Sequence, residues 1–408
     1  MSTRPLEDLK VLDFSWVVAG PMVGRVLADF GATVIRVETT KKVDTARLIG
    51  PYQEGTPGVE NSALYGNVNA GKYGMTLDMA TETAREIALD LVRWADVVVE
   101  SFSPGVMKKW GLDYECLCQI NPKIIMLSTS LLGSTGPYSK FAGFGNLGSA
   151  MSGIMNLAGW TDEAPKGPFG PYSDYIGPRF SLVMLLAAVD HSKRTGKGCN
   201  IDMAQVEAGI HFISQGMLDY EVNHKEIDRN GNADKQMAPH GVYPCLGHTP
   251  LTASYVAISI QNDEQWQTFT TIMNGKELAS NQDYLTFEQR LENTEMIDQI
   301  ITQWTSQLPA LEVERILQSN QIPAHIVASS KDALEDPQLQ HRGHFIELDH
   351  PLHHKTVVEA SRYHLSDTPA SVQRPAPMIG QDNEWILRNV LKYDENTISS
   401  LLTSGICK

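Results

Sequence analysis

Short apolar runs alternate with segments of helical periodicity along the first 130 residues of the chain. Four of these runs are rich in aliphatic residues and are predicted to be strands: 10–15, 32–38, 96–100 and 123–129. Between them, the segment 21–30 opens with a proline and 82–94 is amphipathic, so we expect two helices there. Apolar strands separated by helices indicate an α/β fold, in which a parallel, Rossmann-like sheet is covered on both faces.

The pattern changes near residue 225, where the chain becomes polar and rich in loops. Strands are then predicted at 255–260 and 324–328, with helices at 263–273, 294–307 and 310–319 between them. With 408 residues, the chain also exceeds the size at which one hydrophobic core usually keeps growing. We therefore expect a second, smaller domain in this part of the chain.

The most informative polar residue is Asp174, which lies in a Gly/Pro-rich loop, 170–178, just before a long apolar segment. A helix is predicted from about residue 175 to a basic, glycine-rich end at 191–198, and its middle is apolar all round, which predicts burial. Asp174 then falls at the N-cap, where free backbone N–H groups favour its ionised form. An ionised carboxylate can attack an acyl carbon. Most aspartates in front of helices only cap them, so both interpretations are open at this point.

The composition is that of an ordinary globular protein, and it restricts the possible partners. The hydrophobic fraction is 42% and the charged fraction 20%, and no apolar run approaches the about 18 residues of a membrane span. The N-terminus lacks an apolar signal sequence, so we expect a cytoplasmic protein without a membrane partner. A net charge of −15 argues against nucleic acid as a partner, because phosphate binding needs clustered lysine and arginine.

Two classes of cofactor are set aside by the sequence. The five cysteines are odd in number and scattered, without a paired C-x-x-C, so neither a disulfide framework nor a zinc site is indicated and we expect no metal. Gly143, Gly145 and Gly148 match the dinucleotide pattern G-x-G-x-x-G, but the segment 133–140 separates them from the preceding strand, which argues against an NAD site. We expect these small residues to let the backbone approach a ligand or another segment closely.

Several short motifs follow one another in an order that is itself informative. The N-terminal ones are 11–15, 19–21 and 27–38, followed by Asp44 and Arg47. The later ones are Asn69, Lys72, 77–78, 104–106, 111–112, 121–122, 136–137, Asp174, 194–198, Asp202, Glu207, 336–339, 342–343, 368–369 and 376–380. Each is weak alone, but together they cover nearly the whole chain and resemble the family III CoA transferases, the group of formyl-CoA transferase and the carnitine and benzylsuccinate CoA transferases.

The resemblance implies a fold, an assembly and a reaction. A large Rossmann-like, CoA-binding domain would be formed by residues 1–224 and 330–408, a small domain by 225–329, and two chains would interlock as a homodimer. The family's nucleophile falls on Asp174, whose carboxylate attacks a donor acyl-CoA. The resulting anhydride becomes an aspartyl-CoA thioester, from which CoA passes to an acceptor carboxylic acid. CoA is then a substrate, and no tightly bound cofactor is expected.

The same resemblance implies where CoA binds. In the family, the loop after the first strand contacts CoA, which points to Val17 and Ala19 beside the pantetheine and to Met75 near the adenine. Lys109, with Lys72 as a second candidate, is expected to meet a phosphate. The chain departs from the family pattern at Ser101, where many members carry asparagine.

Three alternatives remain for the activity. The same fold hosts α-methylacyl-CoA racemase, but racemases carry a histidine in an Ala-Gly-His-Asp run, where this chain has Phe144 after Gly143. A non-catalytic acyl-CoA-binding protein would have no need of Asp174. An intramolecular CoA transferase, which moves CoA between two carboxyl groups of one diacid, would use the same nucleophile. The segments 174–180 and 240–245 are closer to the branch that acts on succinyl-CoA and on larger, often aromatic or dicarboxylic, acceptors.

Overall fold

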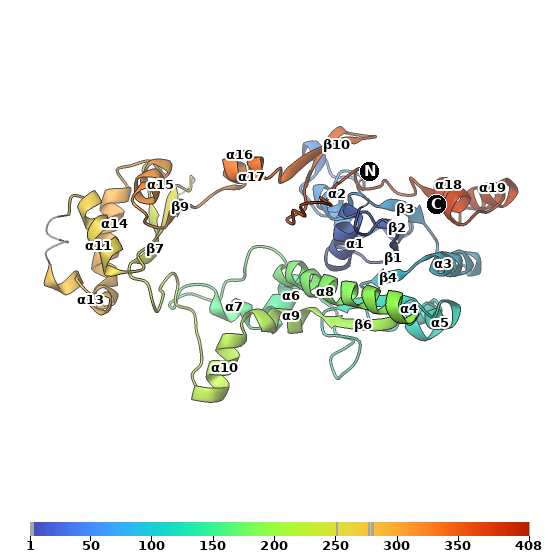
Figure 1. Cartoon of the computed structure of the whole chain (residues 1–408), viewed down its shortest axis with the longest axis horizontal. Helices are drawn as coiled ribbons and strands as arrows, with labels where there is room; N and C mark the ends of the chain where they lie inside the picture. The colour runs from blue at the N-terminus through green and yellow to red at the C-terminus, as the bar shows by residue number, and fades with distance from the viewer. Residues whose placement is uncertain (1–3, 250–251, 276–277, 279–280, 408) are drawn as a thin grey trace. The chain divides into compact units, whose positions relative to one another are not determined.

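The computed structural model describes residues 4–249, 252–275, 278 and 281–407 of the chain, and its elements are labelled in Figure 1. The chain forms two compact units. The large unit consists of Met1–Ala158, Pro165–Asp228 and Pro337–Lys408, and the small unit of Gly159–Ala164 and Arg229–Asp336. Both ends of the chain therefore belong to the large unit.

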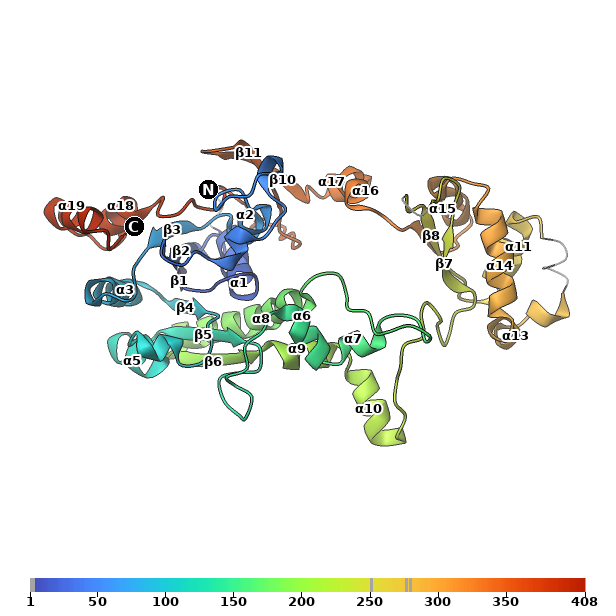
Figure 2. The ribbon, with the colours of Figure 1, turned by 180° about the vertical axis from the view of Figure 1, so that it is seen from behind.

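Six parallel strands form the sheet of the large unit, in the order β3-β2-β1-β4-β5-β6 (Figures 1 and 2). The strands are β1 Lys10–Asp13, β2 Thr33–Glu38, β3 Tyr73–Thr76, β4 Val97–Glu100, β5 Ile125–Ser130 and β6 Cys199–Ala204. The chain adds strands outward from β1 on one side and outward from β4 on the other, so the strand order reverses between them. Ligands of such sheets bind outside the carboxyl ends of the strands at the reversal, which is where the loops after β1 and β4 lie.

Helices cover both faces of this sheet, as the apolar strands predicted. They are α1 Ala19–Asp29, α3 Glu82–Trp94, α5 Tyr114–Ile120, α8 Tyr172–Thr195, α18 Asn383–Trp385, η4 Ile386–Val390 and α19 Glu395–Ser404. α1 and α8 pack on the face that carries Val11, and α3, α5 and the C-terminal helices pack on the face that carries Leu12. Figures 1 and 2 both show the C-terminal helices, in red, beside α3 and β3. The end of the chain thus completes the cover of a sheet that begins at residue 10.

The remaining elements of the large unit are short: η1 Thr45–Leu48, η2 Gln53–Gly55, α2 Ala63–Asn69, α4 Val106–Lys109, α6 Gly145–Met151, α7 Ile154–Leu157, α9 Gln205–Phe212, α10 Ser214–Asn223, α17 Pro337–His341, β10 Phe345–His350 and β11 His354–Glu359. β10 and β11 form an antiparallel hairpin that packs near α2. α6 and α9 both contact α8. These contacts bring three helices together around the first turn of α8.

The small unit contains an antiparallel sheet of three strands in the order β7-β8-β9. Its elements are β7 His240–Pro244, β8 Tyr255–Ser259, α11 Asp263–Ile272, η3 Gln282–Tyr284, α13 Phe287–Glu292, α14 Thr294–Thr305, α15 Ala310–Ser319, β9 Ala324–Ile326 and α16 Ser330–Glu335. Val256 and Ile258 of β8 pack against Trp266 and Phe269 of α11 and Ile301 of α14. The small unit therefore has a hydrophobic core of its own.

Most of the predicted elements are confirmed close to their expected bounds. The segments predicted at 10–15, 32–38, 82–94, 96–100 and 310–319 are β1, β2, α3, β4 and α15. Five strands were not predicted: β3, β6, β7, β10 and β11.

The start of α8 differs from its prediction. The helix begins at Tyr172, with Pro171 as its N-cap, so Asp174 lies inside the first turn and the prediction that it caps this helix is wrong. Its end is as predicted, because Gly196 closes the helix in the left-handed conformation at φ 73°.

The predicted burial of α8 is wrong for one of its faces. Leu182 and Leu185 are buried against the sheet, but the side chains of Val183 and Met184 are 67% and 55% exposed. A helix on a sheet buries only the stripe that faces the strands, and within the described part of the chain the opposite stripe stays exposed. Among the described residues, no helix is both long and apolar enough to span a membrane.

Candidate active site

Asp174 lies where α6, α8 and α9 of the large unit meet. Its side chain comes from the first turn of α8 and is only 6% exposed. Burial raises the pKa of its carboxyl group, and hydrogen bonding by the backbone N–H of Gly145, at the start of α6, and by the side-chain amide of Gln205, at the start of α9, acts in the opposite direction. Two donors from two other elements therefore hold one buried carboxylate.

The glycines of the 143–148 segment make this contact possible. A Cβ atom at Gly145 would lie 2.7 Å from Oδ1 of Asp174, and one at Gly148 would lie 2.5 Å from Oγ of Ser173. Both distances are shorter than any side chain tolerates, so only glycine lets α6 approach α8 this closely. The expectation that these small residues let the backbone approach another segment is confirmed, and that segment carries Asp174.

Phe144, which lies between Gly143 and Gly145, distinguishes this site from that of a racemase. Phe144 is the N-cap of α6 and directly precedes Gly145, whose N–H binds Asp174. Racemases of this fold carry histidine in this run. A phenyl ring cannot transfer a proton. Position 144 therefore does not provide Asp174 with the acid/base partner that racemisation needs.

Burial raises the pKa of Asp174 from 3.8 to about 6, against the opposing effect of the Gly145 and Gln205 hydrogen bonds. The carboxylate is therefore mostly ionised at neutral pH but is more basic than an ordinary aspartate. Both properties favour a nucleophile, because attack requires the ionised form and nucleophilicity grows with basicity.

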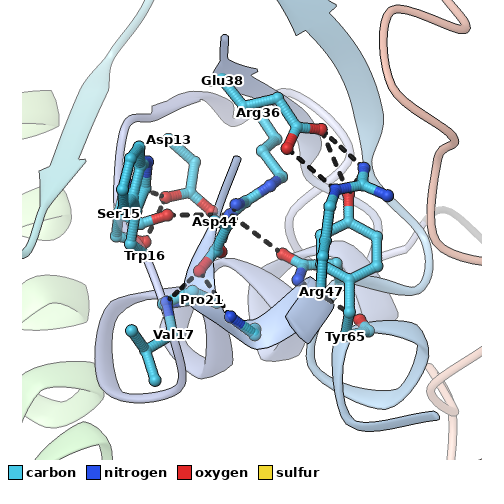
Figure 3. Close-up of polar contacts among 12 residues, drawn as sticks. Asp13, Ser15, Trp16, Val17, Pro21, Arg36, Glu38, Asp44, Arg47 and Tyr65 are labelled. Atoms are coloured by element: carbon cyan, nitrogen blue, oxygen red, sulfur yellow. Dashed lines mark hydrogen bonds and ion pairs between the residues drawn. The ribbon is translucent and has the colours of Figure 1, made fainter. Parts of the chain in front are cut away.

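The loop after β1 has a backbone conformation that a branched residue rarely adopts. Val17 has φ 66°, in the left-handed region that normally favours glycine. Its N–H donates to Oδ1 of Asp44 at 2.9 Å (Figure 3). The N–H of Trp16 donates to Oγ of Ser101 at 2.8 Å. The serine that departs from the family pattern therefore fixes the loop that is expected to contact CoA, and Ala19 begins α1 directly after it.

A buried network of charged side chains lies beside this loop (Figure 3). Arg36 of β2 pairs with Asp44 and also donates to the carbonyl oxygen of Ser15 at 2.8 Å. Arg47 pairs with Glu38 at 2.6 Å, and all four charged side chains are fully buried. Asp44 thus receives the loop N–H on one oxygen and the guanidinium of Arg36 on the other. The strained loop is held by ion pairs that belong to the core.

The structure places the remaining predicted CoA contacts in different environments. Lys72 is fully buried, and its ammonium donates to Asp13 at 2.8 Å, to the carbonyl oxygen of Pro21 at 2.8 Å and to Asn69 at 2.9 Å. These bonds use all three of its hydrogens, so none is left for a phosphate. Met75 is fully buried in β3. Lys109 is exposed at the end of α4. We keep Lys109 as a candidate and leave Lys72 and Met75 out of the CoA site.

A further buried carboxyl group, which the sequence did not single out, ends β4. Glu100 is next to Ser128 of β5 in the sheet register, and Ser128 is next to Asp202 of β6, so the three form a row at the carboxyl edge. Glu100 accepts the N–H of Phe102 at 2.8 Å. Burial raises its pKa from 4.5 to about 7, and the charge of Asp202 adds to the increase. An acidic residue ending an apolar central strand is the sequence signal for such a group.

We expect Glu100→Gln to remove a pH-dependent loss of stability. In the native protein this carboxyl group keeps its proton up to about pH 7, whereas the unfolded chain releases it near pH 4.5. Between these two pH values the native state holds one proton more than the unfolded chain. The free energy of unfolding of the wild type therefore falls as the pH rises from about 4.5 to about 7, by about 3 kcal/mol in all. Glutamine accepts the Phe102 N–H without a charge. Urea unfolding of both proteins at pH 5 and pH 8 measures the difference.

The matched control is Glu115→Gln, at an exposed position on α5. This control is expected to follow the wild type at both pH values. If Glu100→Gln also follows the wild type, Glu100 is not protonated in the native protein.

The described residues offer no constellation for a bound metal ion. Among them, no group of three or more histidine, cysteine, aspartate or glutamate side chains is placed to hold one. The five cysteines are free thiols, and Cys245 and Cys407 are buried.

The chain matches CoA-transferase family III over residues 6–383. It is 31% identical over 387 residues to the succinate–glutarate CoA-transferase of Agrobacterium fabrum, a match that covers 94% of this chain and 95% of that protein. It is 30% identical over 399 residues to the succinyl-CoA–D-citramalate CoA-transferase of Chloroflexus aurantiacus, covering 98% and 97% of the two chains. Among solved structures, a CAIB/BAIF family protein from Brucella suis is similar, with a TM-score of 0.87 and 30% identity over 95% of this chain and 99% of that one.

Proposed function

The chain belongs to CoA-transferase family III and transfers CoA from an acyl-CoA to a carboxylic acid; from this we propose that succinyl-CoA is the donor and that Asp174 carries CoA as a thioester between two half-reactions. The names of both relatives support a succinyl or succinate substrate, and one of them names glutarate as the second acid. The observation that carries the proposal is the buried Asp174 carboxylate, which two hydrogen-bond donors hold at the family's nucleophile position.

In the first half-reaction, a carboxylate oxygen of Asp174 attacks the thioester carbon of the donor. The C–S bond breaks, CoA leaves as the thiolate, and a mixed anhydride joins Asp174 to the donor acid. The thiolate then attacks the aspartyl carbonyl carbon of the anhydride. This step forms the aspartyl-CoA thioester and releases the donor acid as a carboxylate.

The second half-reaction runs the same steps in reverse with the acceptor. The acceptor carboxylate attacks the aspartyl thioester, CoA thiolate leaves, and a new mixed anhydride forms. Attack of the thiolate on the acceptor carbonyl gives the acceptor CoA ester and restores the Asp174 carboxylate. No net proton, oxidant or cofactor is needed, because each step exchanges one anionic nucleophile for another.

The surroundings of Asp174 suit both intermediates. Anhydrides and thioesters are lost to hydrolysis when water reaches them, and the side chain of Asp174 is 6% exposed. Its pKa of about 6 keeps it ionised at neutral pH while making it more basic than a solvated aspartate. The same burial therefore activates the nucleophile and protects its products.

For CoA itself, we propose that the loop around Val17 and Ala19 contacts the pantetheine and that Lys109 meets a phosphate. The support is the position of that loop at the carboxyl end of β1, beside the reversal of strand order. The strained conformation of Val17, which Asp44 holds, is typical of a functional backbone site. Lys109 is exposed, so a phosphate in solution can reach its ammonium group.

We also infer from the family that two chains interlock as a homodimer. The exposed apolar side chains on α8, α9 and α10 support this: Val183, Met184, Leu186, Phe212, Met217, Leu218 and Val222. A group of this size is unusual on a surface that stays in water.

Mass spectrometry of the protein mixed with succinyl-CoA tests the proposal. The denatured wild-type chain is expected to gain the mass of CoA less one water, and hydroxylamine is expected to remove the adduct, since it cleaves thioesters. Native spectra of the same sample report whether the protein is a dimer.

Asp174→Ala provides the comparison and is expected to show no adduct. An adduct of equal yield in this variant would move the nucleophile to another residue. A wild-type protein that turns over succinyl-CoA without any adduct at steady state or after rapid quenching would argue for direct transfer.

A further inference from the structure

A small cavity of the large unit lies between α1, α2 and α8. The segment 359–363, which follows the hairpin, closes it on another side. Its volume is about 20 Å³, which exceeds the about 10–15 Å³ that one water molecule needs, so it has room for one small polar group. Two of its lining residues, Met22 and Val68, pack in one apolar cluster with Val17 and Val18. The cavity therefore adjoins the loop that we expect to contact CoA.

Five charged side chains line this cavity, and their pairing leaves one positive charge. They are Arg25, Asp29, Arg179, Glu359 and Arg362. Arg25 pairs with Asp29 at 2.7 Å, and Arg362 pairs with Glu359 at 2.7 Å. Within the described residues Arg179 forms no ion pair, and its Nη1 is buried without a hydrogen-bond partner. One singly charged anion in the cavity would complete the set.

Hydrogen bonds fix the neighbours of Arg179 independently of it. Arg25 also donates to the carbonyl oxygens of Asn67, at 2.5 Å, and of Glu359, at 2.8 Å. The carboxylate of Glu359 accepts from the side-chain amide of Asn67 at 2.9 Å, besides its ion pair with Arg362. Burial lowers the pKa of Arg179, and the positive charge of Arg362 adds to the decrease. Arg179 is thus the group of this cavity with which an anion would pair.

We propose that this cavity binds the distal carboxylate of a dicarboxylic acyl group through the guanidinium of Arg179. This inference rests on the proposed role of Asp174 as the nucleophile. A guanidinium presents its N–H donors in a planar fork that matches a carboxylate, and such charge-assisted bonds are strong. The enzyme then selects diacids, such as succinate and glutarate, against monocarboxylic acids of the same length.

The position of Arg179 on α8 favours the acyl group over CoA as the source of the anion. Arg179 follows Asp174 on the same helix, about 7.5 Å farther along its axis. In a succinyl group only two methylene groups separate the thioester carbon from the distal carboxylate. This short chain and the long arginine side chain together span that distance. The phosphates of CoA lie at the far end of the pantetheine arm, away from the thioester that Asp174 attacks.

The first half-reaction tests the proposal with one acyl group at a time. Butyryl-CoA matches succinyl-CoA in chain length but carries a methyl group in place of the distal carboxylate. The rate constant for formation of the CoA adduct, measured by rapid quenching and mass spectrometry, is expected to be about 10²-fold higher with succinyl-CoA in the wild type. Arg179→Met is expected to lower this rate constant about 10²-fold with succinyl-CoA, because the distal charge loses its partner. With butyryl-CoA the same variant is expected to stay within about threefold of the wild type.

Two further variants accompany Arg179→Met. Arg194→Met is the matched control, because Arg194 lies on the same helix in an exposed ion pair with Asp190 at 2.8 Å, and it is expected to follow the wild type with both esters. Arg179→Lys keeps the charge but loses the planar fork, so it is expected to lower the rate constant about 10-fold with succinyl-CoA alone. If Arg179→Met fails to fold, Arg179→Lys decides the question.

The two esters separate this inference from the proposed function. Equal losses with both esters in the Arg179 variants would overturn the inference, because a phosphate of CoA in the cavity, or damage to the fold, affects every CoA ester alike. A wild type that forms the hydroxylamine-sensitive adduct equally fast from both esters would also overturn it, while the nucleophile would stand. If neither ester gives an adduct in the wild type, the proposed function and this inference fall together.

Discussion

Asp174→Asn is expected to lower kcat for the transfer of CoA from succinyl-CoA to glutarate by at least about 10⁴-fold. Asparagine has nearly the shape of aspartate, and its Oδ1 still accepts a hydrogen bond from Gly145 or Gln205. Its amide cannot form the anhydride, so the covalent route is lost while the surrounding fold is kept. Separation of the CoA esters by liquid chromatography, with detection by mass, measures the rate.

Asp190→Asn is the control for this substitution. Asp190 lies on the same helix, but it forms an exposed ion pair with Arg194 at 2.8 Å and is expected to be replaceable without loss of activity. The Asp174→Ala variant guards against deamidation, which would restore the aspartate. A variant at position 174 that keeps more than about a hundredth of the wild-type kcat would contradict the proposed mechanism.

The central strands of the large sheet were predictable because their signal is local. β1, β2, β4 and β5 are apolar on both faces, and the sheet covers them with helices on both sides. The missed strands β3 and β6 lie at the two edges of the sheet. β6 alternates between half-buried and exposed residues, and β3 contains a glycine, so neither has a continuous apolar run.

The edge of β3 also shows why a local pattern was insufficient there. The N–H of Gly74 donates to Asp382 and that of Thr76 to Asn383, both at 2.8 Å. Side chains more than 300 residues away along the chain thus satisfy an edge that would otherwise be open. The pleat of β3 is fixed by these distant partners, which its own sequence does not reveal.

Asp174 could be found from the sequence, but its environment could not. A carboxylate in a Gly/Pro loop before a long helix suggested a cap. The helix instead begins at Tyr172, two residues before Asp174, and the carboxylate faces α6 and α9. Gln205 was missed because β6 was missed. It is the first residue after that strand, and carboxyl ends of parallel strands are where sites of this fold form.

Lys72 illustrates a limit of charge as a signal. A lysine beside glycine in a loop is usually solvated, and the family order makes it a candidate for a phosphate. The structure gives it a buried role, and burial lowers its pKa to about 8 against the opposing charge of Asp13. Only its hydrogen bonds to Asp13 of β1, to Pro21 of α1 and to Asn69 of α2 distinguish the two roles, and those contacts are not encoded within any short segment.

Arg47→Met is expected to lower the free energy of unfolding of the large unit by about 3–5 kcal/mol, the usual cost of breaking a buried ion pair from one side. Arg47 is fully buried and donates to both carboxylate oxygens of Glu38, to Glu60, to the hydroxyl of Tyr65 and to the carbonyl oxygen of Pro377. Methionine fills much of the space but leaves the charge of Glu38 without its partner. Urea unfolding, followed by circular dichroism, measures the loss.

The cost should come mainly from the charge left behind, and a second substitution tests this reasoning. Arg47→Met combined with Glu38→Met removes both charges, so the double variant is expected to lose less stability than the sum of the two single variants. Arg93→Met, which breaks an exposed ion pair with Asp90, is the control and is expected to change stability by less than about 0.5 kcal/mol. Strict additivity in the double variant would mean that Arg47 acts through its other bonds, above all the one to Pro377 that ties the C-terminal segment to the start of the chain.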